Sequence, residues 1–169
     1  RLDRRAAITA QLTAHDLPFE IIDAIDGRSG LTEAQKSAVD HAAVQRHLGR
    51  PLSDPEIACA QSHQSVYQRV ITLDLGGAVI LEDDATLTTA FATLYRARAY
   101  QRFDILQFGY RRARVFPSRW LWPHLTEDIR AARVLLNSEV ASTYSVNQRA
   151  ARYLSHGPKP IGGPADWPR

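Results

Sequence analysis

A run of apolar residues that ends in three carboxylates constrains the fold of this chain more than any other feature. Residues 77–84 read Gly-Ala-Val-Ile-Leu-Glu-Asp-Asp. An apolar run without alternation predicts a buried strand of a parallel sheet that is covered on both faces. In sheets of that kind, ligands bind just outside the carboxyl ends of the strands, which is where the three acids would lie.

The three acids, Glu82, Asp83 and Asp84, allow two interpretations. Adjacent carboxylates repel one another, and a divalent cation that prefers hard oxygen ligands, such as Mg²⁺ or Mn²⁺, would stabilise them together. Alternatively, the acids form a turn that caps the next helix, with Asp84 or Thr88 as the N-cap residue. The pattern alone leaves both interpretations open.

Length and composition predict one globular domain over residues 1–169. A chain of 169 residues is long enough to bury a sizeable core, and its 44% hydrophobic and 23% charged residues are typical of soluble proteins. No apolar run has the length of a transmembrane helix, and no signal-peptide pattern is present. The single cysteine, Cys59, cannot form an internal disulfide, which favours a reducing, cytoplasmic compartment.

The charge of the chain favours anionic partners. Its formal net charge is +3 and all but two of its 21 basic residues are arginine, whose planar guanidinium binds phosphate through two hydrogen bonds. A nucleotide, a phospholipid surface or a phosphorylated glycan would suit this charge. The arginines do not gather on one helix, so the sequence does not predict nucleic-acid binding.

Hydrophobic periodicity and turn residues predict alternating helices and strands. The first helix ends near His15, before Pro18, and a short strand and a turn follow it. This order is part of a βαβ unit whose first strand is expected before Arg1. Further helices are predicted over 31–48, 53–73 and 147–155, and strands over 19–22, 77–81, 104–109 and 140–146.

The helix predicted from Ser53 carries two candidate site residues. Ser53-Asp54-Pro55-Glu56 is a strong helix start, and Glu56, His63 and Tyr67 share one helical face. In one interpretation Glu56 only starts the helix and His63 is a hydrogen-bonded histidine in the core. In the other, both residues face a ligand crevice.

Several site classes do not fit the sequence. It has no zinc-ligand spacing, no phosphate-binding or dinucleotide-binding glycine motif, and no nucleophile elbow. A phosphoaspartate hydrolase needs an aspartate nucleophile with a second aspartate two residues later. Counting from Glu82 or from Asp83 breaks that pattern, because Glu82 is not an aspartate and Ala85 is not an acid.

A nucleotide-sugar glycosyltransferase fits better. Glu82 and Asp84 are two residues apart, the spacing of the D-x-D motif, and such residues point the same way in an extended chain. Acids at a strand end can hold a divalent ion, which offsets the charge that builds on the leaving nucleoside diphosphate.

Four blocks of the sequence, in order, resemble glycosyltransferase family 25, the bacterial lipopolysaccharide and lipooligosaccharide glycosyltransferases related to collagen galactosyltransferases. The blocks are Leu2-Asp3-Arg4-Arg5, residues 17–27 with Asp26-Gly27 at their end, residues 56–63, and residues 79–85. A weaker fifth block comprises Ser142-Thr143-Tyr144 and, after a helix, Pro164-Ala165-Asp166-Trp167.

The resemblance implies an α/β protein with a GT-A-like single domain, in which helices flank a mostly parallel sheet. It also implies inverting transfer of a hexose, most often galactose, from a UDP-sugar donor to a glycan such as lipopolysaccharide, with Mn²⁺ or Mg²⁺ as cofactor. Such an enzyme works in the cytoplasm, in peripheral contact with the inner face of the cytoplasmic membrane.

The resemblance also implies roles for individual residues. Arg4, Arg5, Asp26 and Gly27 would border the nucleoside, and Glu56 and His63 would lie near the donor. The acids would form the metal and diphosphate site, with Glu82 and Asp84 on the metal and Asp83 on the donor. Asp166 is the candidate general base, because inverting transfer needs a carboxylate that takes the proton of the acceptor hydroxyl.

Two departures from the family pattern bear on activity. The first strand is expected before Arg1 and the chain stops just after Asp166, so we expect both ends to be incomplete. Residues 111–135 follow no family pattern, which leaves the acceptor open. A non-catalytic family member that binds nucleotide or glycan is therefore the alternative function.

Overall fold

The computed structural model describes residues 2–109, 113–136, 142–156, 161–163 and 165, and the chain divides into two compact units. Unit 1 comprises residues 1–20 and 76–147, and unit 2 comprises residues 21–75 and 148–169. The chain passes from one unit to the other three times, so neither unit is one continuous segment. The single domain expected over 1–169 stays a prediction.

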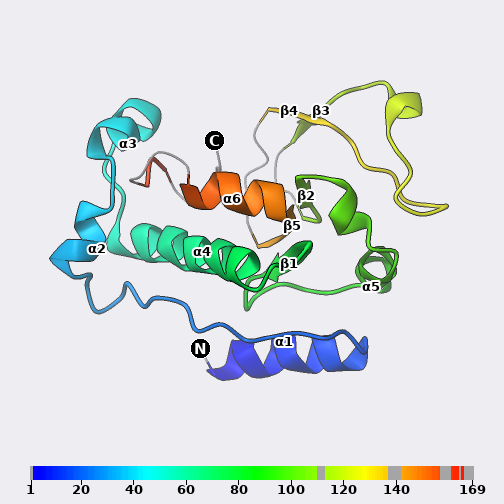
Figure 1. Ribbon diagram of the computed structural model, residues 1–169, viewed down its shortest axis with the longest axis horizontal. Coiled ribbons are helices and arrows are strands. Elements are labelled where there is room, and N and C mark those ends of the chain that lie inside the picture. Colours follow the sequence, from blue (N-terminus) through cyan, green and yellow to red (C-terminus); the bar gives the residue numbers. More distant parts are fainter. Residues whose placement is uncertain (1, 110–112, 137–141, 157–160, 164, 166–169) are drawn as a thin grey trace. The chain divides into compact units, whose positions relative to one another are not determined.

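Unit 1 combines helices with two small sheets (Figure 1). Its helices are α1 (Leu2–Ala14) and α5 (Thr89–Arg96), with the 3₁₀ helices η1 (Ala99–Arg102) and η2 (Arg119–Leu121). Its strands are β1 (Gly77–Leu81), β2 (Ile105–Gln107), β3 (Arg114–Val115), β4 (Val134–Leu136) and β5 (Thr143–Asn147). The helix of the first residues and the three strands predicted in this part of the chain are therefore confirmed.

The predicted parallel sheet is not confirmed, because every strand pair in the described residues is antiparallel. The larger sheet has the order β1-β5-β2, in which Ser145 of β5 faces Val79 on one side and Leu106 on the other. β3 and β4 form a separate antiparallel pair. β1 and β2 run in the same direction, but β5 lies between them. The buried residues Tyr144, Ser145 and Val146 make β5 the central strand, whereas β1 buries only Ile80.

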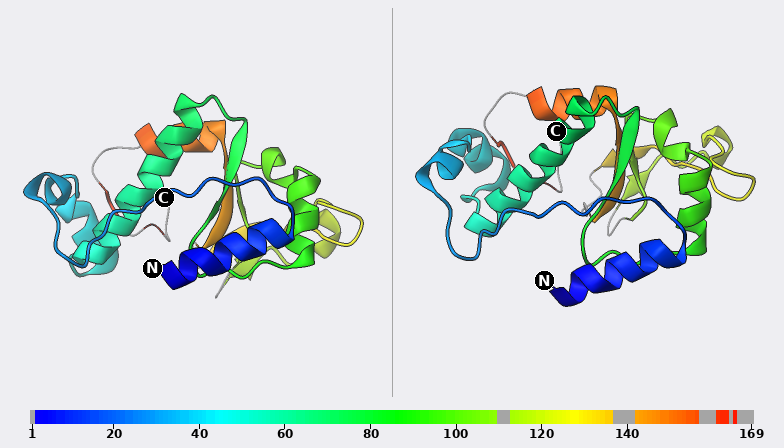
Figure 2. Two further views of the ribbon diagram at one scale, coloured as in Figure 1. Left: turned by 90° about the horizontal axis from the view of Figure 1, so that it is seen from below. Right: turned by 60° about the horizontal axis from the view of Figure 1, so that its bottom comes forward.

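The core of unit 1 forms where α1 and α5 meet the larger sheet. Ile8 and Leu12, one turn apart on α1, pack with Leu87 and Phe91, and Val79 and Leu81 of β1 contact the same cluster. Both views of Figure 2 show α1 beside the strands of the sheet. Burial of this apolar stripe fixes one face of α1, and the residues on its other positions remain available for polar contacts.

The described part of unit 2 contains four helices, whose ends match local sequence signals. They are α2 (Glu33–Ser37), α3 (His41–Leu48), α4 (Asp54–Thr72) and α6 (Gln148–His156). Asp40 accepts the Ala43 amide at the start of α3, and Gly49, with a φ of 69°, ends that helix in the left-handed conformation. These elements confirm the helices predicted over 31–48, 53–73 and 147–155.

The core of unit 2 packs against α4. Ile57 and Ala58 contact Val44 of α3, and Leu52 and Ile161 belong to the same cluster. α4 also packs against α6, which lies beside it in Figure 1. The buried face of α4 includes His63 and Tyr67, so the helix buries a polar stripe together with its apolar residues.

Residues 17–27 contain no regular secondary structure, so the strand predicted over 19–22 is wrong. Phe19 and Ile22 are 43% and 40% exposed, and no described strand pairs with this segment. Apolar residues with high strand propensity do not form a strand without a partner. Among the described residues, no helix has both the length and the apolarity needed to cross a membrane.

Candidate functional site

The three acids form a turn at the end of β1, in unit 1. The Glu82 amide continues the pairing of β1 with a hydrogen bond to the Ser142 carbonyl (2.9 Å), and the Ala85 amide closes the turn onto the Glu82 carbonyl (3.1 Å). Glu82 is half-buried, whereas Asp83 and Asp84 are exposed. Thr88 is the N-cap of α5 and accepts the Phe91 amide. The N-cap of α5 is therefore Thr88, and Asp84 does not cap this helix.

Arg4 of α1 holds the two exposed carboxylates together. Its Nη1 donates to Asp83 Oδ1 (3.2 Å) and to Asp84 Oδ2 (3.1 Å), although about eighty residues separate it from them. Both oxygens therefore converge on one cationic nitrogen. The structure brings Arg4, which the resemblance placed beside the nucleoside, to two of the acids that it placed at the metal and diphosphate site. Arg4 supplies a positive charge where a metal was expected.

Gln11 fixes the turn from the same helix. Its Nε2 donates to the Ala85 carbonyl (3.2 Å), and its Oε1 accepts the Leu87 amide (2.8 Å). Gln11 is seven residues, or two turns, after Arg4, so both residues lie on one face of α1. Sequence reasoning missed Gln11, because a glutamine within a helix belongs to no motif.

The residues of the acid turn fit a small divalent cation. Carboxylate oxygens are the ligands that Mg²⁺ and Mn²⁺ prefer, and those of Asp83 and Asp84 already converge on a positive charge. Both side chains keep more than two fifths of their surface exposed, so an ion can reach them from solvent. A cation held by Asp84 would compete with Arg4 for that carboxylate, and Arg4 would then be available to another anion.

In unit 2, the turn at Asp26 and Gly27 packs against the start of α4. A Cβ on Gly27 would lie 2.6 Å from the Asp54 carbonyl oxygen and 2.9 Å from the Ala58 Cβ, so only glycine fits there. The Ile25 amide donates to Ser62 Oγ (2.9 Å) on the same helix. The packed glycine holds the turn against α4, and the Ser62 contact, which the sequence did not predict, supports it.

Asp26 is bound to Arg28 in this turn. Its Oδ1 accepts the Arg28 amide and Nε, and its Oδ2 accepts Nη2 at 2.7 Å. These hydrogen bonds, from the side chain first and then the backbone, hold the pKa of Asp26 well below its usual range. Asp26 therefore stays ionised and fixes the conformation of the turn. Its role beside a nucleoside stays a prediction.

Glu56 is part of the helix start. Its Oε2 accepts the Ser53 amide (2.8 Å) and hydroxyl (2.9 Å), and its carboxylate pairs with Arg50, with Oε1 at 2.6 Å from Nη2. The Arg50 hydrogen bond, followed by those from Ser53, lowers the pKa of Glu56 to about 2 against the opposing effect of burial. This is the helix-start role that the sequence allowed, and a role at the donor stays a prediction.

We expect Glu56 to stabilise the fold in a pH-dependent way. Its pKa is depressed in the folded state, so this stabilisation is complete above the usual value of 4.5 and is lost as the pH falls toward about 2. Glu56→Gln keeps the capping geometry but not the charge, so its free energy of unfolding should be lower than that of wild type at neutral pH. This deficit should shrink as the pH falls over that range. Glu56→Ala should also lose about 1 kcal/mol of capping stability at every pH. Urea unfolding at a series of pH values measures both, and a constant deficit for Glu56→Gln would contradict the ion-pair role.

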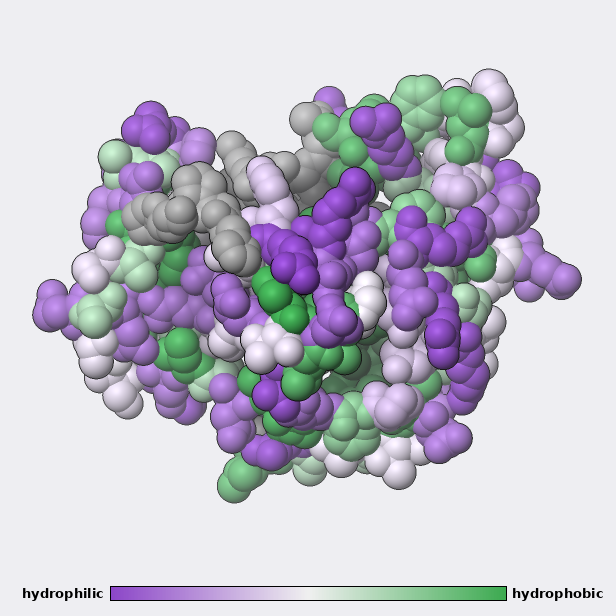
Figure 3. Space-filling model, in the orientation of Figure 1, coloured by the Kyte–Doolittle hydropathy of each residue, from purple (hydrophilic) through white to green (hydrophobic). Residues whose placement is uncertain are grey.

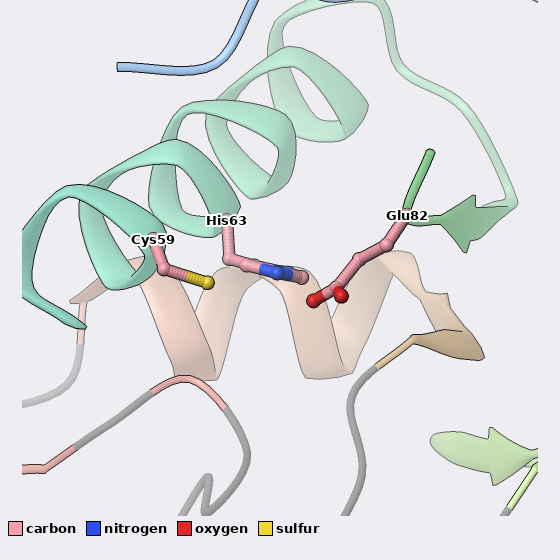
Figure 4. A group of neighbouring side chains, drawn as sticks. All are labelled: Cys59, His63 and Glu82. Carbon is pink, nitrogen blue, oxygen red and sulfur yellow. The ribbon is translucent and has the colours of Figure 1, made fainter. Parts of the chain in front are cut away.

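His63 lies on the buried face of α4. It is 7% exposed, and its ring centroid is 6.5 Å from that of Tyr67. Figure 4 shows Cys59 one turn before it on the same face, and it also draws Glu82 after β1. Cys59, His63 and Glu82 each offer one atom that could hold a metal ion. Burial agrees with a core histidine, and the donor role of His63 stays a prediction.

Two further candidates have no structural test. Arg5 is exposed on α1 beside Arg4, and its role stays a prediction. Asp166 lies outside the described residues, as do most residues of the segment after α6.

Comparison with known proteins agrees with the blocks found in the sequence. Residues 1–166 match the family model described as "Glycosyltransferase family 25 (LPS biosynthesis protein)". The chain is 30% identical over 95 residues to procollagen galactosyltransferase 2 of Homo sapiens and 31% identical over 94 residues to that of Mus musculus. It is 28% identical over 98 residues to the inactive glycosyltransferase 25 family member 3 of Mus musculus.

These similarities cover a limited part of each relative. The matched stretch is 54% of this chain in all three cases, and only 15% or 16% of the relatives. The relatives also differ from one another in activity, since one of the three bears the word inactive in its name.

Proposed function

Because the chain belongs to glycosyltransferase family 25, we propose that it is a metal-dependent, inverting hexosyltransferase. It moves a hexose, most simply galactose, from a UDP-sugar to a cell-surface glycan such as lipopolysaccharide. The match over residues 1–166 includes both compact units, which supports one catalytic domain. The procollagen galactosyltransferases among its relatives favour galactose as the sugar.

The convergence of Asp83 and Asp84 on Arg4 Nη1 carries this proposal. Asp84, with Glu82, would hold Mn²⁺ or Mg²⁺, and Asp83 would contact the donor. When bound, the ion would offset the charge that develops on the leaving diphosphate. Arg4 would then exchange its carboxylate partners for the diphosphate, which its guanidinium binds through charge-assisted hydrogen bonds.

The other proposed residues complete the donor site. Arg5, Asp26 and Gly27 would border the nucleoside, with Glu56 and His63 nearby. The enzyme would act in the cytoplasm, at the inner face of the cytoplasmic membrane. A single cysteine agrees with a reducing compartment.

Calorimetry with UDP, with and without Mn²⁺, tests the donor site. Wild type should bind UDP more tightly with the metal. Arg4→Gln should bind Mn²⁺ alone up to about fivefold more tightly, because an exposed ion pair no longer competes. The same variant should bind UDP about tenfold more weakly, because a charged hydrogen bond is lost. Arg46→Gln, an equal charge change at an exposed position of α3, is the control.

The donor-site proposal fails if UDP binding does not depend on Mn²⁺ and is the same in Arg4→Gln and Arg46→Gln. If the protein binds UDP with metal but never transfers sugar, it is the non-catalytic alternative. A relative whose name contains the word inactive makes this alternative worth testing.

Asp166 is the proposed general base. It would take the proton of the acceptor hydroxyl on the sugar face opposite the leaving diphosphate, as inversion requires. Asp166→Asn should therefore lose turnover by at least about a hundredfold and keep the UDP affinity of wild type. Normal turnover of the variant in a donor-consumption assay would remove Asp166 from this role.

A further inference from the structure

The segment between β3 and β4, in unit 1, exposes large hydrophobic side chains. Trp120 is 78% exposed and Leu121 is 52% exposed, side by side in η2. Phe116, Val134 and Leu135, on or beside the two strands, are also exposed. Figure 3 shows hydrophobic surface at the upper right, over the part that Figure 1 draws at β3, β4 and the yellow segment next to them. Clustered exposed hydrophobic residues indicate an interaction surface.

Hydrogen bonds inside the segment hold this surface in place. The Trp122 indole donates to the Phe116 carbonyl (2.8 Å), and Arg130 Nη1 donates to the Arg119 carbonyl (3.2 Å). Leu125, 8% exposed, anchors the segment in a hydrophobic cluster of unit 1. Trp122 is thereby half-buried while Trp120, two residues earlier, points its ring to solvent. Trp120 is therefore exposed on a segment that hydrogen bonds and apolar packing hold in a defined conformation.

Arginines accompany the hydrophobic residues. The two strands and the segment between them carry four that are exposed, namely Arg114, Arg119, Arg130 and Arg133. Across the ranges described above, the ion pairs are made by other residues, so no carboxylate neutralises these four. The acids of the segment are Glu127 and Asp128, which leaves two positive charges in excess. A partner that is both apolar and anionic would complement such a surface.

We propose that this surface, comprising Phe116, Trp120, Leu121, Val134 and Leu135 with the four arginines, docks on an anionic lipid bilayer. Tryptophan is favoured at the boundary of headgroups and acyl chains, leucine and valine enter the apolar layer, and arginine reaches from there to lipid phosphates. A glycan would stack on aromatic rings, but the exposed residues here are mostly aliphatic. The inference rests on the membrane location proposed above, for which it names the contacting surface, but it does not depend on the donor site.

Vesicle co-sedimentation of the whole chain tests the proposal. One set of vesicles contains phosphatidylglycerol and phosphatidylcholine in equal parts, and the other contains phosphatidylcholine alone. Wild type should bind the anionic vesicles more tightly. Trp120→Ala should weaken that binding roughly tenfold through lost apolar burial. Arg114→Gln and Arg133→Gln should each weaken it about fivefold, since each arginine near the surface contributes separately.

The chain offers matched controls. Leu73, the C-cap residue after α4, is 50% exposed, nearly the same as Leu121, so Leu121→Ser should weaken vesicle binding while Leu73→Ser should not. Arg46→Gln removes one exposed charge elsewhere. All these positions are on the surface, and thermal unfolding should confirm that each variant folds. The tryptophan emission of wild type should shift to shorter wavelength on anionic vesicles, and Trp120→Ala should lose most of that shift.

Three results would overturn the proposal. One is equal vesicle binding by wild type and Trp120→Ala, and another is equal binding to the two kinds of vesicle. The third is evidence that a second copy of the chain, and not lipid, binds this surface. In that case sedimentation without lipid would show wild type as a dimer and Trp120→Ala as a monomer, and wild type would not bind vesicles.

Discussion

Replacing Asp84 with asparagine is expected to lower sugar transfer by about a hundredfold or more and to remove the dependence of UDP binding on Mn²⁺. The amide keeps the shape of the side chain but not its charge, so the oxygen that now faces Arg4 Nη1 at 3.1 Å becomes a weak cation ligand. The fold should be almost unaffected, because an exposed ion pair contributes about 1 kcal/mol or less. Donor consumption and calorimetry with UDP measure the two effects.

Asp83→Asn is the matched control for this result. Asp83 contacts the same Arg4 nitrogen at 3.2 Å and has nearly the same exposure as Asp84, 43% against 48%. The two variants therefore perturb the fold equally. If Glu82 and Asp84 hold the metal, Asp83→Asn should bind UDP more weakly but keep its Mn²⁺ dependence. Equal behaviour of the two variants would show that position 84 has no special role.

The helices could be predicted from the sequence because their signals are local. Ser53 and Glu56 lie three residues apart, and Asp40 and Gly49 mark the two ends of α3. A helix cap depends on residues within about one turn of the helix end, so a short stretch of sequence is enough to predict it. The apolar run before Glu82 likewise forms β1 over the predicted residues.

The order of the strands could not be predicted, because it depends on contacts between distant residues. β5 inserts between β1 and β2, more than sixty residues after the former, and reverses the direction of each pairing. The apolar run of β1 favours a strand covered on both faces, whereas β1 is half-buried and pairs with β5 alone among the described strands. The parallel sheet was therefore an interpretation that hydrophobicity alone could not test.

Some residues of the candidate site could likewise be predicted from the sequence, and others could not. The family resemblance selected Arg4 and the acids, and the structure joins Asp83 and Asp84 through one nitrogen of Arg4. The partners Gln11 and Arg50 were missed, because a glutamine in a helix and an arginine before one carry no motif. Their roles come only from what lies opposite them in the fold.

Gly27→Ala is expected to destabilise unit 2 by about 3 kcal/mol. The new Cβ would lie 2.6 Å from the Asp54 carbonyl oxygen and 2.8 Å from the carbon that bears it, closer than atoms can approach without movement. These are backbone atoms in the first turn of α4, so no side-chain rotation relieves the overlap. Relief requires that the turn at Asp26 move away from the helix, which would break the bond from the Ile25 amide to Ser62.

Gly163→Ala separates this packing effect from the general effect of replacing glycine. Among the described residues, no atom lies within 4 Å of a Cβ at Gly163, and that substitution should leave the free energy of unfolding nearly unchanged. Urea unfolding compares the two variants under conditions in which wild type is fully folded. If Gly27 also borders the nucleoside, the folded fraction of Gly27→Ala should bind UDP more weakly than Gly163→Ala does. If Gly27→Ala were as stable as wild type, the turn would not pack on α4 in solution. The proposal that Asp26 and Gly27 together border the nucleoside would then lose its basis.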